Sequence, residues 1–234
     1  NPGIGIFIYR DADGTGTFSK TGVQLRWNYG ANGVPDAANI DIRIFAIEQV
    51  YVPPGSFYIG TGEPEYGTFY KYPTTTNAYY ITSENQITVG TSANNLYYNN
   101  NYGGSGDQQG PIPAGFPKGY NAFYCMKYEI SQQEYVDFLN SLTQSQANSR
   151  KYTANDYRYA ITGNTVGSYA TSNPYVVCNY LNWADLSAYL DWCGLRPMTE
   201  LEFEKACRGT LPSVPQEYAW GTTGIAGTSY TLSN

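Results

Sequence analysis

The sequence contains no histidine among its 234 residues. Catalytic triads with an imidazole base, histidine-ligated zinc and histidine proton shuttles are therefore excluded within this chain. Charge is also scarce: 13 basic and 19 acidic residues give a net charge of −6, and the basic residues form no cluster. Because little positive charge is available to neutralise phosphates, nucleic acid is not an expected partner. No apolar run approaches the roughly 20 residues of a membrane helix, so no membrane span is expected.

What the chain has in abundance is tyrosine and glycine, with 25 of each. Hydrophobic residues make up 41% of the chain, enough for the core of one large domain or of one domain with a small companion. A surface rich in aromatic residues and poor in charge is typical of a secreted protein. We therefore expect an extracellular or cell-surface location.

Residues 1–48 carry the period-two pattern of β-strands. In residues 23–29 apolar and polar side chains alternate, and in residues 40–44 three isoleucines alternate with Asp41 and Arg43. The pattern predicts a small antiparallel sheet, or the last strands of a β-sandwich. We place a domain boundary here, with a β segment over 1–48 and a second domain over 49–234.

A long stretch of low complexity, NNLYYNNNYGGSGDQQGPIP, occupies residues 94–113. Such a sequence buries little apolar surface, so it predicts a long surface loop. The loop is either an excursion without function or a partner-binding surface, because exposed tyrosines make contacts at low entropic cost. The candidate contact residues are Tyr97, Tyr98 and Tyr102.

Three stretches have the start signals of amphipathic helices. Each begins with a polar N-cap residue followed three positions later by an acidic residue, and apolar residues then recur at helical spacing. The predicted helices cover residues 131–143, 182–194 and 199–209.

The third of these stretches, LRPMTELEFEKACRG at residues 195–209, is the most highly charged part of the chain. Phe203, Ala206 and Cys207 share one face, which we expect to point inward. Glu200 and Glu204 lie four apart and would repel each other unless a basic residue intervenes, whereas Glu202 points elsewhere. Helix capping and structural salt bridges are therefore favoured over paired-carboxylate catalysis.

The four cysteines lie in apolar surroundings, at positions Cys125, Cys178, Cys193 and Cys207. Copper(I) favours thiolate ligands, and two suitably placed cysteines would bind it. Buried thiols or structural disulfides are nevertheless favoured over a metal site. If disulfides form, four cysteines allow three connectivities, which remain open.

Four linked motifs resemble the formylglycine-generating-enzyme, or sulfatase-modifying-factor, family, which has a C-type-lectin-like fold. They are VYVPPGSFYIG, FYCMKYEISQQEYVDFL, NWADLSAYLDWCGLRPMTELEFEKACRG and EYAWG. The resemblance covers residues 49–234 and implies an α+β fold with irregular loops and three helices, preceded by the β segment. The upstream strands are similar to those attached to such domains in Bacteroidetes-type surface proteins.

In that family a copper ion held by two cysteines oxidises a substrate cysteine to formylglycine, and calcium ions brace the fold. The resemblance places the copper-binding pair well beyond the motif matched by Trp220 and Gly221, and this sequence ends 13 residues after Gly221. We therefore expect an N-terminal, scaffold-forming half of the domain with no cofactor of its own. Asn234 matches a first calcium ligand, so calcium is expected only if the C-terminal half exists. Cys207 matches a position that is disulfide-bonded in some relatives.

These observations favour a non-catalytic secreted or surface protein that uses its lectin-like scaffold for self-assembly, adhesion or ligand display. Its expected partners are itself, other surface proteins or glycans. One alternative is the N-terminal part of a copper-dependent formylglycine-generating oxidase. A second is a component of an envelope secretion or gliding machinery.

Overall fold

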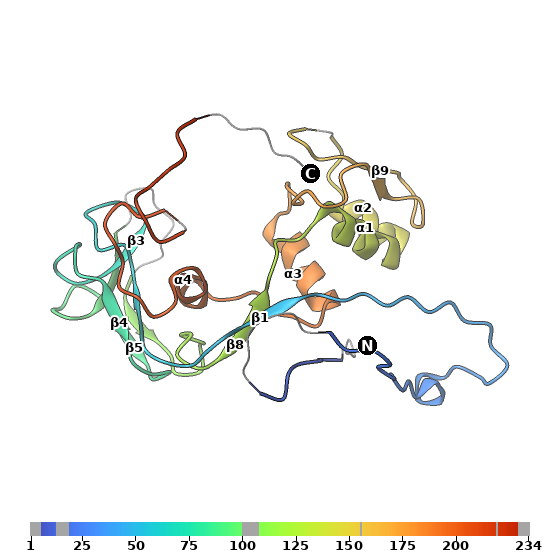
Figure 1. Cartoon of the computed structure of the whole chain (residues 1–234), viewed down its shortest axis with the longest axis horizontal. Coiled ribbons are helices and arrows are strands. Elements are labelled where there is room, and N and C mark those ends of the chain that lie inside the picture. Colours follow the sequence, from blue (N-terminus) through green and yellow to red (C-terminus); the bar gives the residue numbers. More distant parts are fainter. Residues whose placement is uncertain (1–5, 13–18, 100–107, 155, 219, 229–234) are drawn as a thin grey trace.

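The computed structural model describes residues 6–12, 19–99, 108–154, 156–218 and 220–228. These residues form two lobes joined by a two-stranded ribbon (Figure 1). One lobe contains small β-sheets and one helix, and the other is mainly helical. Mixed α and β content with irregular loops confirms the expected fold class.

The ribbon between the lobes is made of β1 (Gln49–Val52) and β8 (Phe123–Met126), which pair antiparallel. In the sheet lobe, β2 (Phe57–Ile59) pairs antiparallel with β4 (Tyr79–Ile81). A four-stranded sheet has the order β3-β6-β5-β7, in which only β5 and β6 are parallel. Its strands are β3 (Thr68–Lys71), β5 (Ile87–Val89), β6 (Leu96–Asn99) and β7 (Gly110–Ile112).

The core of the sheet lobe is built from alternate strand residues and one helix residue. Phe57 and Ile59 of β2 are fully buried while Tyr58 between them is half-buried, as expected for a strand with one face on the core. Helix α4 (Glu200–Arg208) adds Leu201 to the same cluster. The Lys118 side chain is also buried here, and its ammonium group donates to the carbonyl oxygens of Phe116, Pro113 and Glu84.

The helical lobe packs its own, larger core. It contains α1 (Gln132–Ser141), α2 (Gln144–Arg150), α3 (Trp183–Trp192) and a short antiparallel pair, β9 (Ile161–Thr162) with β10 (Ala170–Thr171). Tyr135, Phe138 and Leu139 of α1 meet Tyr189 and Leu190 of α3, and all five are buried. The three predicted helices are confirmed, and α2 is an additional one.

Polar contacts lock the helices of this lobe together. The Arg150 guanidinium donates to the carboxylate of Asp185 at 3.2 Å, which ties α2 to α3. The Tyr135 hydroxyl donates to the Arg150 carbonyl at 2.8 Å. Each of α1 to α4 begins with a complete capping box, so the N-cap and N3 amides of each of these helices have partners.

The strands predicted over residues 23–29 and 40–44 do not form. In the described part of residues 6–48 the regular structure is a 3₁₀ turn, Tyr29–Asn32, and almost every side chain is exposed. A strand requires a neighbouring strand to pair its backbone groups, and the chain acquires one only at Gln49, where β8 lies alongside β1. The division into domains 1–48 and 49–234 stays a prediction. Among the described helices, none has the length and apolar character needed to cross a membrane.

Candidate functional site

Helix α4 is held against the sheet lobe by a network of ionic hydrogen bonds. The Arg196 guanidinium donates to both carboxylate oxygens of Glu202, at 2.8 and 2.6 Å. Glu202 also accepts the backbone N–H of Thr199, whose hydroxyl donates to the Pro117 carbonyl at 3.0 Å. Burial alone would raise the pKa of Glu202, but hydrogen bonds from Arg196 and Thr199 hold it below its ordinary value. Glu202 is therefore a structural carboxylate, as the sequence predicts.

The other end of α4 fixes the turn after β2. The Glu204 carboxylate accepts the Gly60 N–H at 3.1 Å, and the Arg208 guanidinium donates to the Gly60 carbonyl at 3.0 Å and to Glu217 at 3.0 Å. Burial raises the pKa of Glu204 despite these partners. Arg208 and Glu217 also line a hollow of about 360 Å³, together with Glu63 and Glu65.

Metal-ligand geometry is not found in the part of the chain that the structure describes. No three described cysteines, aspartates or glutamates lie close enough together to hold a metal ion. Of the carboxylates that line the hollow, Glu217 pairs with Arg208, which also contacts Glu204 of its own helix. Glu204 and Arg208 brace the turn after β2 through both backbone groups of Gly60.

The outward face of α4 differs from the sequence-based expectation. Phe203 is 51% exposed, and Ala206 and Cys207 are exposed as well, so the prediction that this face points inward is wrong. The inward face is formed by Leu201 and Lys205 instead. The Lys205 ammonium donates to the Gly119 carbonyl at 2.5 Å and lies 5.3 Å from the centre of the Phe57 ring. The whole Lys205 side chain, including its apolar stem, is buried.

All four cysteines are free thiols in three different environments. Cys178 is buried, Cys125 and Cys193 are half-buried, and Cys207 is exposed. Burial raises the pKa of Cys178 to about 12 and that of Cys193 to about 11. The pKa values of Cys125 and Cys207 are also raised, mainly by partial desolvation. In the chain without a metal, burial therefore favours the protonated thiol over the thiolate at each position.

The tyrosines expected in a surface loop lie partly in a strand. Tyr97 and Tyr98 belong to β6 and are half-buried, opposite Tyr70 and Phe69 of β3. The ring centre of Tyr97 is 5.7 Å from that of Tyr70, and the ring centre of Tyr98 is 5.1 Å from that of Phe69. These rings stabilise the sheet. Tyr102 and Asn234, the possible calcium ligand, lie outside the described residues.

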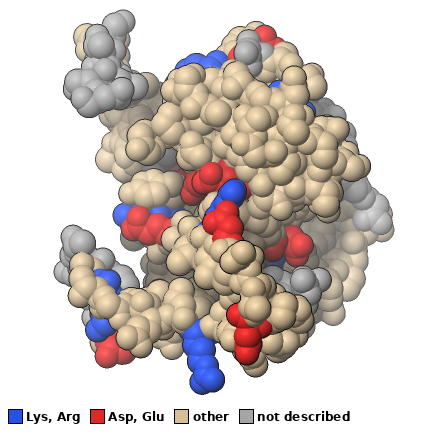
Figure 2. Space-filling view, turned by 90° about the vertical axis from the view of Figure 1, so that its right-hand side faces the viewer, with Lys and Arg blue, Asp and Glu red and all other residues tan. Residues whose placement is uncertain are grey.

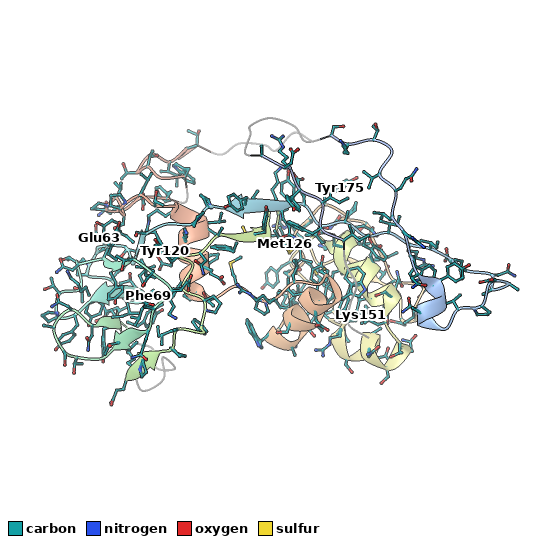
Figure 3. The ribbon with its side chains drawn as sticks, turned by 90° about the horizontal axis from the view of Figure 1, so that it is seen from below. Glu63, Phe69, Tyr120, Met126, Lys151 and Tyr175 are labelled. Carbon is teal, nitrogen blue, oxygen red and sulfur yellow. The ribbon has the colours of Figure 1, made fainter. Side chains whose placement is uncertain are left out.

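Apolar side chains are instead exposed elsewhere, on both lobes and along the N-terminal segment. Trp183 at the start of α3 is 69% exposed and Tyr175 is 94% exposed. Figure 3 shows Met126 of β8 between the two lobes, with Tyr175 over the helical lobe. On the face seen in Figure 2, charged side chains are few and uncharged residues form most of the surface. The sequence shows which residues are apolar, but it does not predict that these side chains are left exposed by the fold.

Comparison with known proteins finds a family match for the chain. The family model described as "Sulfatase-modifying factor enzyme 1-like domain" matches residues 95–232. No curated protein matches the chain. No solved structure matches it either. The matched residues include the β8 strand, all four helices and the loops that position them, so the chain belongs to the sulfatase-modifying-factor family.

Proposed function

We propose that this chain is a non-catalytic member of its family that acts at the cell surface or outside the cell as a scaffold for association with other protein chains. The observation that carries the proposal is the exposure of large apolar side chains along the N-terminal segment and on both lobes. Ile42, Ile44 and Trp183 are 64%, 75% and 69% exposed. Extensive exposure of large apolar side chains suits a surface that another molecule covers.

The chemistry of the described residues supports a role without catalysis. The sequence offers no histidine as a general base. Burial or partial desolvation raises the pKa of each of the four thiols and favours the protonated form, so none is activated as a nucleophile. The buried Glu202 and the half-buried Glu204 are engaged by Arg196, Arg208 and backbone amides.

Weak charge and exposed aromatic rings also suit contact with an uncharged partner. We rank a second copy of the chain first, other surface proteins next and glycans last. The order follows from the apolar character of the exposed residues, since burial of apolar side chains is the main driving force of protein association. Calcium and copper are not needed for this association in our proposal.

Two measurements on the purified chain test the proposal together. Light scattering across a concentration series is expected to show association, unchanged by a metal chelator. Mass spectrometry of a cysteine-containing peptide, incubated with the chain, copper and oxygen, is expected to show no conversion of cysteine to formylglycine. A chain that remains monomeric and binds neither surface proteins nor glycans contradicts the scaffold role, and peptide oxidation contradicts the absence of catalysis.

A second candidate function follows from the family itself. The matching family model is named for an enzyme, and this favours a chain that forms part of a copper-dependent oxidase. Reading the gene on both sides of this sequence distinguishes the two. A closely spaced cysteine pair encoded downstream would support the oxidase, and the scaffold proposal expects none.

A further inference from the structure

Residues 39–45 form an exposed, extended segment in which isoleucines alternate with charged residues. Ile40, Ile42 and Ile44 are 51%, 64% and 75% exposed. The segment runs as an extended chain beside the helical lobe before it enters β1 (Figure 1). No described strand pairs with it. Its backbone donors and acceptors are therefore free to pair with a strand from another molecule.

The segment is anchored at its C-terminal end. The Phe45 ring lies 4.9 Å from that of Trp192 in α3, and Ile47 packs against the helical core. The two faces of the segment differ in chemistry. Alternate positions carry isoleucine, and the intervening positions carry Asp41 and Arg43, whose charged groups are 3.3 Å apart. Both of these side chains are largely exposed, so they can exchange their present contact for another.

We propose that residues 39–45 pair antiparallel with the same residues of a second copy, around a two-fold axis at Ile42. This inference rests on the proposed scaffold function and names the partner of its surface. In this register Asp41 lies opposite the second copy's Arg43, and Arg43 lies opposite the second copy's Asp41. On the other face, Ile42 meets its own equivalent and Ile40 meets the second copy's Ile44. Each face is thus complementary to itself, as a two-fold interface requires.

The charge pattern selects this register over its neighbours. An antiparallel pairing centred on Asp41 would place the two copies of that carboxylate opposite each other. A pairing centred on Arg43 would oppose two guanidinium groups, and a parallel in-register pairing would oppose like charges at both positions. Like charges directly opposite each other on neighbouring strands destabilise the pair.

A second copy also fits better than the other alternating segment of the same chain. Residues 23–28 carry Gln24, Arg26 and Asn28 on their polar face and no acidic residue. Pairing with them would leave Arg43 without a carboxylate opposite. No ladder between the two segments is present among the described residues. Because a two-stranded ribbon is marginally stable alone, the association is expected to depend strongly on concentration.

Charge exchange tests the register. Arg43→Asp and Asp41→Arg each create two like-charge contacts in the symmetric dimer, so each variant alone is expected to associate at least about tenfold more weakly than the wild type. A mixture of the two variants restores opposite charges at both positions and is expected to regain association. Lys20→Asp and Asp11→Arg change the net charge equally at exposed positions outside the segment and serve as controls. Sedimentation velocity measures all of these samples.

Cross-linking tests the position of the axis. In a Cys207→Ser background, which removes the exposed native thiol, Ile42→Cys is expected to form an intermolecular disulfide under mild oxidation. Ile40→Cys is the matched control, because the two copies of residue 40 would lie about 13 Å apart along the ribbon. Far-UV circular dichroism verifies that each variant is folded.

The outcomes separate this inference from the function on which it rests. If the wild type associates but neither charge variant weakens it, or if position 40 cross-links as readily as position 42, the proposed pairing is wrong and the scaffold role stands. If the wild type is monomeric at every concentration and binds no other partner, both the proposed pairing and the scaffold function are wrong. Recovery of association by the mixed variants supports both.

Discussion

At the scale of single residues, the carboxylates of α4 have the capping and salt-bridge roles that the sequence predicts. The apolar face of the same helix is exposed, which the sequence does not predict. A capping box has a fixed spacing, so the sequence TELE at residues 199–202 is enough to predict the capping role of Glu202. The burial of Lys205 is not readable in this way. A buried lysine needs polar partners for its ammonium. Here the partners are the carbonyl oxygens of Gly119 and Tyr120, in a loop about 85 residues earlier in the chain.

The Glu202 contact gives a prediction about pH. Because the folded pKa lies below the ordinary value of 4.5, the carboxylate stabilises the fold above that pH and loses this contribution as the pH falls through the folded pKa. Glu202→Gln is expected to lower the free energy of unfolding by about 1–3 kcal/mol at pH 7, with a smaller difference at pH 3. Urea denaturation at both pH values measures it.

Glu200→Gln is the matched control, since Glu200 is exposed at the start of the same helix. It is expected to change stability by no more than about 0.5 kcal/mol. An equal loss in both variants, or a Glu202→Gln effect that is independent of pH, would show that the ionic contact does not stabilise α4.

At the scale of elements, local signals predicted the helices well and the strands poorly. Caps and apolar spacing lie within one stretch of sequence, so α1, α3 and α4 are found within a few residues of their ends. Helix α2 was missed because QSQANSR lacks an apolar stripe and buries only Ala147. Alternation over residues 40–44 indicates two faces, but a strand also requires a partner that the local pattern cannot supply.

The turn that links β2 to β3 gives a prediction at this scale. Gly60 has φ of +89°, and a Cβ at this position would overlap the carbonyl oxygen of Phe69. Because the obstacle is backbone of the neighbouring strand, Gly60→Ala is expected to lower the free energy of unfolding by about 2–4 kcal/mol. Thermal denaturation measures this loss.

Gly115→Ala provides the comparison, because a Cβ at Gly115 meets no neighbour within 4 Å and its φ is not left-handed. It is expected to be neutral or slightly stabilising. Should the two substitutions prove equally mild, the turn that α4 fixes through Glu204 and Arg208 is more adaptable than its contacts indicate.

At the scale of the whole molecule, the described residues form two separate hydrophobic cores joined by the β1–β8 ribbon. The family match covers residues 95–232, which include β8 of this ribbon and all four helices. The sequence does not predict which apolar residues are left exposed for a partner to cover. The exposure of Phe203 or Ile44 depends on how distant segments pack. The central proposal is that two copies of the chain associate through residues 39–45 of the N-terminal segment.

Hydrogen–deuterium exchange of the wild-type chain at low and high protein concentration tests that claim most directly. In dilute solution the amides of residues 39–45 have no strand partner among the described residues, and they are expected to exchange rapidly. At high concentration the account predicts slower exchange in this segment, with little change in α1 and α3. Exchange in residues 39–45 that stays fast at every concentration, while the chain associates through another surface or not at all, would contradict it.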